Sequence, residues 1–119
     1  MSKVKRKLTT ILATDCVGFS KRMDENEELT LENLKACRSI IDPQIKEFGG
    51  RIFYTAGDSV IAEFESPVEC VNAAIGFQKA INDRNNTLSE ESQLDWRVGI
   101  HLDDVIIEGD NVYGNGVNI

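Results

Sequence analysis

Two aspartates follow β-prone runs of the sequence, at positions where carboxylates can do chemistry. The first, Asp15, comes after the apolar run Leu8–Ala13 and before Val17-Gly18-Phe19-Ser20, which has the pattern of a turn that opens a helix. Ligands of open α/β layers collect outside the carboxyl ends of strands, and the first N–H groups of a helix can bind an anion. Asp15 on its own fits a helix cap equally well, so the functional interpretation needs a second carboxylate.

That second carboxylate is Asp58, in the turn Ala56-Gly57-Asp58-Ser59 between two β-like runs. Glycine supplies the backbone angles of a tight hairpin, and a Gly-Asp pair is also a good turn in its own right. Pairing of the strands that carry Asp15 and Asp58 would bring the two carboxylates together. Nearby carboxylates repel each other, and a divalent cation relieves the repulsion by binding both. Two-metal sites use such pairs to activate an attacking oxygen and to neutralise a departing phosphate.

The residues around both aspartates resemble class III nucleotidyl cyclases, which are the adenylate and guanylate cyclase catalytic domains. Each matching block would be weak alone, but the blocks occur in the same order across nearly the whole chain. The resemblance is therefore specific. The matching blocks are Thr14–Ser20, Asp42-Pro43, Phe48–Arg51, Gly57-Asp58, Trp96–His101 and Val112–Asn118.

The resemblance implies a two-metal mechanism for making a 3′,5′-cyclic nucleotide and pyrophosphate from a nucleoside triphosphate. Two ions per site, Mg²⁺ or Mn²⁺, would be held by Asp15 and Asp58, with the main-chain carbonyl of Cys16 as a further ligand. One metal would help to deprotonate the ribose 3′-OH, which then attacks the α-phosphate in line. The backbone amides that would hold the β- and γ-phosphates are those of Val17, Gly18, Phe19 and Ser20.

The family works as a head-to-tail dimer, in which one subunit supplies the metals and the other reads the purine. The purine-reading Lys and Asp of adenylate cyclases align with Tyr54 and Asn111, which do not carry the same charges, so the base is read differently or not at all. Asn118 matches the asparagine that orients the ribose. The family's transition-state arginine would lie beyond Ile119, and loss of such a group typically costs roughly 10²–10³-fold in rate.

Composition bounds the class of protein. A chain of 119 residues with 41% apolar and 28% charged residues fits one globular domain. The net charge of −7 argues against nucleic acid as a partner, because neutralising phosphates requires a basic face. Three widely spaced cysteines without a CxxC pair indicate reduced thiols and a cytoplasmic protein. No apolar run is long enough to span a bilayer, and the basic start leads into no signal-peptide core.

Apolar spacing predicts the elements that must position these residues. A basic tail is expected over residues 1–6 and a strand over about 7–15. An amphipathic helix then ends at Gly49-Gly50, and Pro43 should kink or locally break it, because proline removes a donor and crowds the preceding turn. Its expected buried stripe, at three- and four-residue spacing, is Leu31, Leu34, Cys37, Ile41, Ile45 and Phe48.

A second helix has a strong start signal. Ser66 is the expected N-cap, Pro67 the first helical residue, and Glu69 the closing residue of a capping box. The helix should fade near Asn85-Asn86, and a polar loop over 87–93 follows it. Its expected buried stripe is Val68, Val71, Ala74, Ile75 and Ile81.

The strands complete the fold prediction. Strands near 51–56 and 59–65 form the hairpin around Asp58, and a strand from about 94 to 102 is continued or restarted by 105–107. The order β-α-β-β-α-β is a ferredoxin-like split unit, an α+β fold with an antiparallel sheet and helices on one face. Residues 7–119 are thus predicted to form the core of a cyclase catalytic domain. By resemblance, this domain lacks the family's C-terminal helices and strands.

Three functional interpretations follow. The favoured one is an adenylate/guanylate cyclase of intracellular signalling, with ATP preferred to GTP as its substrate. The alternative is a catalytically weak or inactive cyclase-homology module that binds nucleotide or a cyclase-like partner. The Asp15/Asp58 pair favours the enzyme, whereas Tyr54, Asn111 and the absent arginine favour the module. A ferredoxin-like domain with acidic turns would leave the ordered blocks unexplained. Apolar surface left uncovered by the absent segment predicts a homodimer or higher oligomer.

Overall fold

The computed structural model describes residues 5–108 and 111–114. The described part of the chain has the predicted β-α-β-β-α-β order, with the first helical segment divided in two and a short fifth strand added. The elements are β1 (Lys5–Cys16), α1 (Phe19–Glu25), α2 (Glu27–Glu47), β2 (Arg51–Ala56), β3 (Ser59–Phe64), α3 (Pro67–Asn85), the short 3-10 helix η1 (Glu90–Ser92), β4 (Trp96–Glu108) and β5 (Asn111–Tyr113).

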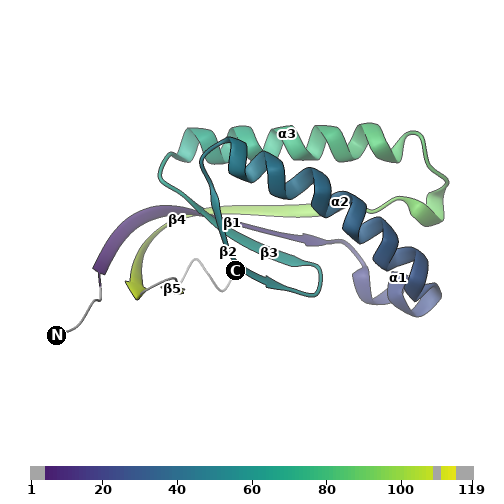
Figure 1. Ribbon diagram of the computed structural model, residues 1–119, viewed down its shortest axis with the longest axis horizontal. Coiled ribbons are helices and arrows are strands. Elements are labelled where there is room, and N and C mark those ends of the chain that lie inside the picture. The colour runs from purple at the N-terminus through teal and green to yellow at the C-terminus, as the bar shows by residue number, and fades with distance from the viewer. Residues whose placement is uncertain (1–4, 109–110, 115–119) are drawn as a thin grey trace.

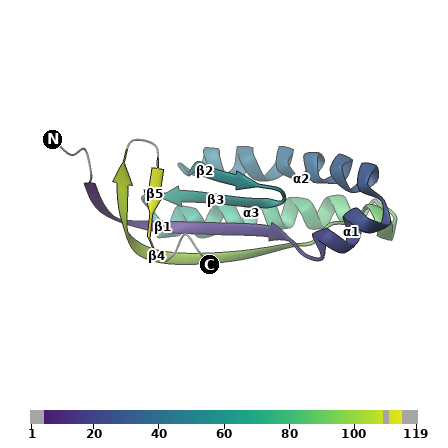
Figure 2. The ribbon, with the colours of Figure 1, turned by 90° about the horizontal axis from the view of Figure 1, so that it is seen from below.

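The described strands form one five-stranded sheet in the order β2-β3-β1-β4-β5, and every neighbouring pair is antiparallel. The long helices α2 and α3 lie side by side over one face (Figure 1). The view from below shows the opposite face of the sheet in front of these helices (Figure 2). This is the predicted α+β architecture, an antiparallel sheet with its helices on one face.

The central strand β1 packs on both of its faces, because alternate side chains of a strand point to opposite sides. Leu12 and Cys16 belong to the main core under the helices. Ile11 belongs to a smaller cluster on the other face, together with Val105 and Val112. Packing on both sides explains why the four consecutive residues Thr9–Leu12 are all buried.

The strand β4 is continuous and does not restart after residue 102. It pairs with β1 over all 12 residues of β1, from Lys5 opposite Ile107 to Cys16 opposite Trp96. This pairing keeps β4 extended through the polar residues 103–104. It also draws residues 5–6, which the sequence placed in the basic tail, into β1.

A kink or a local break was predicted at Pro43, and the break is wrong. Helix α2 runs without interruption from Glu27 to Glu47 with Pro43 inside it. Ile41 and Ile45, on either side of the proline, are fully buried, and this packing outweighs the one hydrogen bond that proline cannot make. Phe48 follows as the C-cap of the helix. No helix in the described ranges has the length and apolar character needed to cross a membrane.

The caps of the two long helices explain where they begin. The Glu69 N–H donates to Ser66 Oγ at 3.2 Å, as the start signal of α3 predicted. The Leu29 N–H donates to Asn26 Oδ1 at 3.0 Å. Asn26 is extended, so it ends α1 and caps α2 in the acidic segment that the sequence left as a link or a first helical turn.

The buried face of α3 differs from the predicted stripe. Val68 and Ile75 are 66% and 62% exposed, and Val71 is exposed as well. Leu31, predicted to be buried on α2, is also exposed. Ala74 and Ile81 of the predicted stripe are buried. The rest of the buried face consists of other residues, among them the small Ala73, which allows the helix to approach the sheet closely, and the large Phe77. The buried residues of α3 are Cys70, Ala73, Ala74, Phe77, Ile81 and Asn85.

Candidate functional site

The turn between β1 and α1 contains the predicted phosphate-binding segment. Gly18 has φ 65° and ψ 30°, in the left-handed region that favours glycine, and α1 begins at the next residue, Phe19. The N–H of Val17 donates to the carbonyl of Asp95 at 2.8 Å. Because Gly18 has no side chain to cap α1, the amides of Phe19 and Ser20 lack both a helical partner and a cap. Of the four amides predicted to bind phosphate, that of Val17 already has a hydrogen-bond partner within the chain.

The second aspartate reaches the end of β1 through the β2–β3 hairpin. Gly57 has φ 57° in the turn, as the sequence predicted. Strand β3 pairs with β1 as far as Val60 opposite Thr14, so the hairpin turn lies beside the end of β1. There the backbone N–H of Cys16 donates to Asp58 Oδ2 at 2.8 Å. The structure thus brings Asp58 to the residue that follows Asp15.

Both carboxylates raise the pKa of the Cys16 thiol. Its pKa is raised from 9.0 to about 12, first by burial, then by the negative charges of Asp58 and of a Cys37 thiolate, with a smaller contribution from Asp15. The positive charge of Arg22 opposes the shift. Because Asp15 and Asp58 act on the same atom, their negative potential converges at the end of β1.

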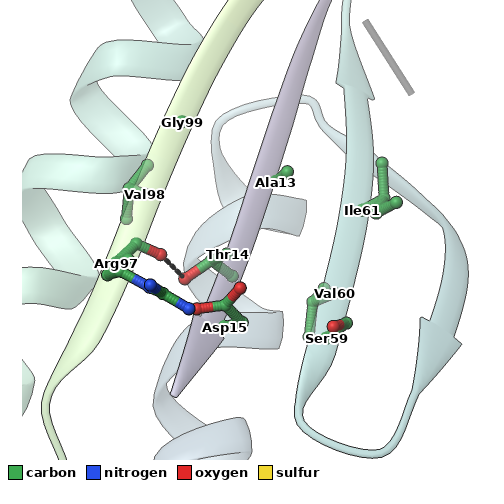
Figure 3. A pocket seen from close by; sticks show the side chains of 9 residues that line it. All are labelled: Ala13, Thr14, Asp15, Ser59, Val60, Ile61, Arg97, Val98 and Gly99. Carbon is green, nitrogen blue, oxygen red and sulfur yellow. Dashed lines mark hydrogen bonds and ion pairs between the residues drawn. The ribbon is translucent and has the colours of Figure 1, made fainter. Parts of the chain in front are cut away.

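Arg97 is a residue of this site that the sequence reasoning missed. Its Nε donates to Asp15 Oδ1 at 2.8 Å, and the two residues lie opposite each other on β4 and β1 (Figure 3). The hydrogen bond and the charge of Asp15 raise the pKa of Arg97 above its ordinary value. The arginine belongs to the quoted Trp96–His101 block, but only the register of β1 against β4 identifies its partner.

A groove of about 400 Å³ runs across β3, β1 and β4 beside this ion pair. Ala13 and Asp15 line it and alternate along β1 with Leu12 and Cys16 of the helix-side core, so the groove lies on the face of the sheet away from the helices. Figure 3 shows Arg97 extending from β4 toward Asp15 over this groove. The lining residues are Ala13, Thr14, Asp15, Ser59, Val60, Ile61, Arg97, Val98 and Gly99.

Tyr54, the first predicted purine-reading residue, lies on the same face of the sheet. It is 52% exposed and pairs with Ile61, which lines the groove. Directly opposed residues of an antiparallel pair project to the same side. The structure therefore places Tyr54 on the face of the sheet that carries Asp15.

Asn111, the second predicted purine-reading residue, begins β5 and pairs with Glu108 at the far end of β4. Asp15 pairs with Arg97, at the other end of β4. At 3.2–3.4 Å per residue, these two positions are roughly 35 Å apart along the strand. One chain therefore does not bring Asn111 to Asp15. Asn118 lies outside the described residues.

Comparison with known proteins identifies the family. No protein-family model matches the chain. The chain is 32% identical to the adenylate/guanylate cyclase/hydrolase from Silicibacter pomeroyi, whose crystal structure matches with a TM-score of 0.88 over 98% of this chain and 68% of that one. The chain belongs to the adenylate/guanylate cyclase family.

Other relatives bear out the family and the fold. This cyclase-family chain is 36% identical over 117 residues to "Putative adenylate cyclase 3" of Rhizobium meliloti (strain 1021). That match covers 98% of this chain and 20% of the relative, so the chain spans about a fifth of the length of that protein. The guanylyl cyclase Cya2 is 24% identical, with a TM-score of 0.80 over 96% of this chain and 67% of that one. At this identity the likeness shows the fold alone.

The residues at the end of β1 of this cyclase-family domain fit a hard divalent cation. Two carboxylates, Asp15 and Asp58, and the main-chain carbonyl of Cys16 are oxygen donors of the kind that Mg²⁺ and Mn²⁺ prefer. No group of three or more His, Cys, Asp or Glu side chains in residues 5–108 and 111–114 is arranged so that it could hold a metal ion. Mg²⁺ is commonly held by one or two carboxylates and completed by substrate phosphates. The donor set therefore suits a cation that binds together with a phosphate rather than a closed protein cage.

Proposed function

We propose that this domain converts a nucleoside triphosphate into a 3′,5′-cyclic nucleotide and pyrophosphate, as part of intracellular signalling. The observation that carries the proposal is the hydrogen bond from the Cys16 N–H to Asp58, which holds that carboxylate beside Asp15. ATP is favoured over GTP, because the 36% identical Rhizobium relative carries an adenylate cyclase name. The cytoplasm is the proposed location, since the three cysteines are free buried thiols.

The roles proposed for the residues around the β1 end follow from their donor chemistry. Asp15 and Asp58 would hold two Mg²⁺ or Mn²⁺ ions, with the main-chain carbonyl of Cys16 as a further ligand. When bound, these cations supply activation of the ribose 3′-OH and neutralisation of phosphate charge. The amides of the segment Gly18–Ser20 would donate to the β- and γ-phosphates. Val17 can join them only by giving up its hydrogen bond to Asp95.

The proposed assembly is a homodimer with two chains arranged head to tail. Tyr54 and Asn111 are assigned to the purine and Asn118 to the ribose. The support is the separation of roughly 35 Å along β4 between Asn111 and Asp15, which a second, oppositely oriented chain would bridge. Symmetric pairs of this kind contain two equivalent sites, each formed by both chains.

A second candidate function is nucleotide or partner binding without turnover. Two observations favour it. Asp15 is occupied by Arg97, and an exposed, uncharged Tyr54 stands where adenylate cyclases carry a lysine. Under this alternative the domain would bind a triphosphate, or dimerise with a cyclase-like partner, and leave the phosphate bonds intact.

The deciding experiment measures cyclic nucleotide formation with Mn²⁺, with ATP and GTP offered separately. The chain is compared with Asp15→Ala and with Asp104→Ala, a matched control on the same sheet whose carboxylate pairs with Arg6. Product from the chain and from the Asp104 control, but not from Asp15→Ala, supports the cyclase and names its base. Absence of product with Mn²⁺-dependent triphosphate binding retained supports the binding module. Absence of both contradicts the cyclase and the nucleotide-binding form of the module.

A further inference from the structure

The two carboxylates at the β1 end have different partners. Asp58 accepts a hydrogen bond from a neutral backbone N–H, that of Cys16. Within the residues that the structure describes, it makes no ion pair. Asp15 instead pairs with the guanidinium of Arg97, with Nε 2.8 Å from Oδ1. One carboxylate is thus open to an incoming cation, whereas the other already has a positive partner.

The Arg97–Asp15 pair can be exchanged. The Arg97 side chain is 70% exposed and that of Asp15 38% exposed, and solvent-exposed pairs of this kind contribute little to stability. The groove beside them is bordered by Ala13, which has a small side chain, and by Gly99, which has none, and this leaves room for the arginine to turn aside. A divalent cation carries twice the charge of the guanidinium, so it can replace Arg97 at Asp15.

We propose that Arg97 is a built-in competitor of the divalent cation at Asp15. This inference rests on the proposed function, because it concerns the same cation site. Arg97 neutralises Asp15 in the metal-free domain and must leave its carboxylate when the cation binds. The two aspartates therefore bind cations unequally, since Asp58 can bind a cation directly, whereas Asp15 can do so only when the cation displaces Arg97. Arg97 thereby lowers the affinity of the site for the metal.

A purely structural ion pair would behave differently. A cross-strand pair that only stabilises β1 against β4 would keep its geometry with or without metal, and its removal would change stability but not metal affinity. Coupling between Arg97 and cation binding therefore separates the two roles. Metal binding without substrate is the appropriate measurement because it does not depend on turnover.

The test is Mn²⁺ binding to the metal-free chain at low ionic strength, with free Mn²⁺ followed by electron paramagnetic resonance. Arg97→Met keeps the aliphatic arm and removes the charge, and we expect it to tighten Mn²⁺ binding about two- to fivefold, the equivalent of an exposed ion pair. Arg22→Met is the matched control, because Arg22 is a nearby cation that acts on Cys16 without bonding to either carboxylate. We expect a smaller gain from it.

A second measurement uses the unmodified protein, and a variant is needed only to assign the signal. The side-chain Nε–H signal of Arg97, assigned with Arg97→Lys, should move toward the position of a free arginine as Mg²⁺ is added. Unchanged or weaker Mn²⁺ binding by Arg97→Met, an equal gain from Arg22→Met, or a stationary Nε–H signal when Mg²⁺ saturates the site would each overturn the inference alone. Absence of Mn²⁺ binding from every variant and from the chain itself would overturn the proposed cation site and the inference together.

Discussion

Asp58 has two separable roles at the level of a single side chain. Its carboxylate accepts the Cys16 N–H, which fixes the hairpin turn to the end of β1, and it carries one of the two charges proposed to hold the cation. An asparagine oxygen can still accept the hydrogen bond but cannot supply the charge. Alanine supplies neither and leaves the Cys16 N–H without its partner.

We therefore expect Asp58→Asn to abolish Mn²⁺-dependent product while leaving the free energy of unfolding nearly unchanged. Asp58→Ala should also abolish product and in addition lower the free energy of unfolding by about 1–3 kcal/mol, the usual cost of an unsatisfied partly buried donor. Urea denaturation and a product assay on both variants check this. Equal destabilisation by the two variants would show that the charge of Asp58, and not its hydrogen bond, stabilises the turn.

Cys70, which lies outside the candidate site, predicts how the stability of the fold depends on pH. Burial raises the pKa of its thiol from 9.0 to about 11. Between these values the unfolded chain loses a proton that the folded chain keeps, so stability is fully present below pH 9 and falls as the pH rises toward 11. The loss attributable to Cys70 by pH 10.5 is about 2 kcal/mol. Urea denaturation at pH 8 and pH 10.5 should give a smaller decrease for Cys70→Ala than for the parent chain, and parallel decreases would contradict this origin.

At the scale of elements, the sequence predicted a feature when the cause of that feature lies in neighbouring residues of the chain. The start of α3 was predictable because Ser66 and Pro67 act on their own neighbours. The buried face of α3 was not, because the chain offers two apolar stripes, and only packing against the sheet selects the one with Ala73 and Phe77. Asp15 and Asp58 could be picked out as strand-end carboxylates. The partner of Asp15, Arg97, could not be picked out, because the two residues are far apart in sequence and only the register of β1 against β4 brings them together.

The local cap of α3 allows a test at this scale. Ser66→Ala removes the acceptor for the Glu69 N–H and should lower the free energy of unfolding by about 1 kcal/mol, the typical value of an N-cap. Ser39→Ala is the matched control, because Ser39 lies inside α2, where its hydroxyl donates to the carbonyl of Lys35. Alanine favours a helix interior, so this control should be neutral or slightly stabilising. Chemical denaturation of both variants measures the difference, and an equal loss would contradict the capping role.

At the scale of the whole molecule, the long pairing of β1 with β4 separates the proposed functions. The end proposed to bind the cation carries Asp15 and Arg97, and the other end carries β5 with Asn111. Apolar side chains are exposed on β1 and β4 between these ends, among them Leu8 and Leu102. Exposed apolar surface of this kind favours association. A head-to-tail dimer would cover part of it and would bring β5 of one chain to the cation-binding end of the other.

Complementation between two inactive chains tests this arrangement directly. Asp58→Asn should lack the cation function and Asn111→Ala the purine function, so each variant alone should form no product. An equimolar mixture should recover about a quarter of the parent activity, because half of the dimers are mixed and each mixed dimer contains one intact site of two. Activity assays on the separate and mixed proteins, with light scattering to confirm the dimer, provide the measurement. A dimeric mixture that stays as inactive as its components would mean that Asn111 does not complete the site of a partner chain.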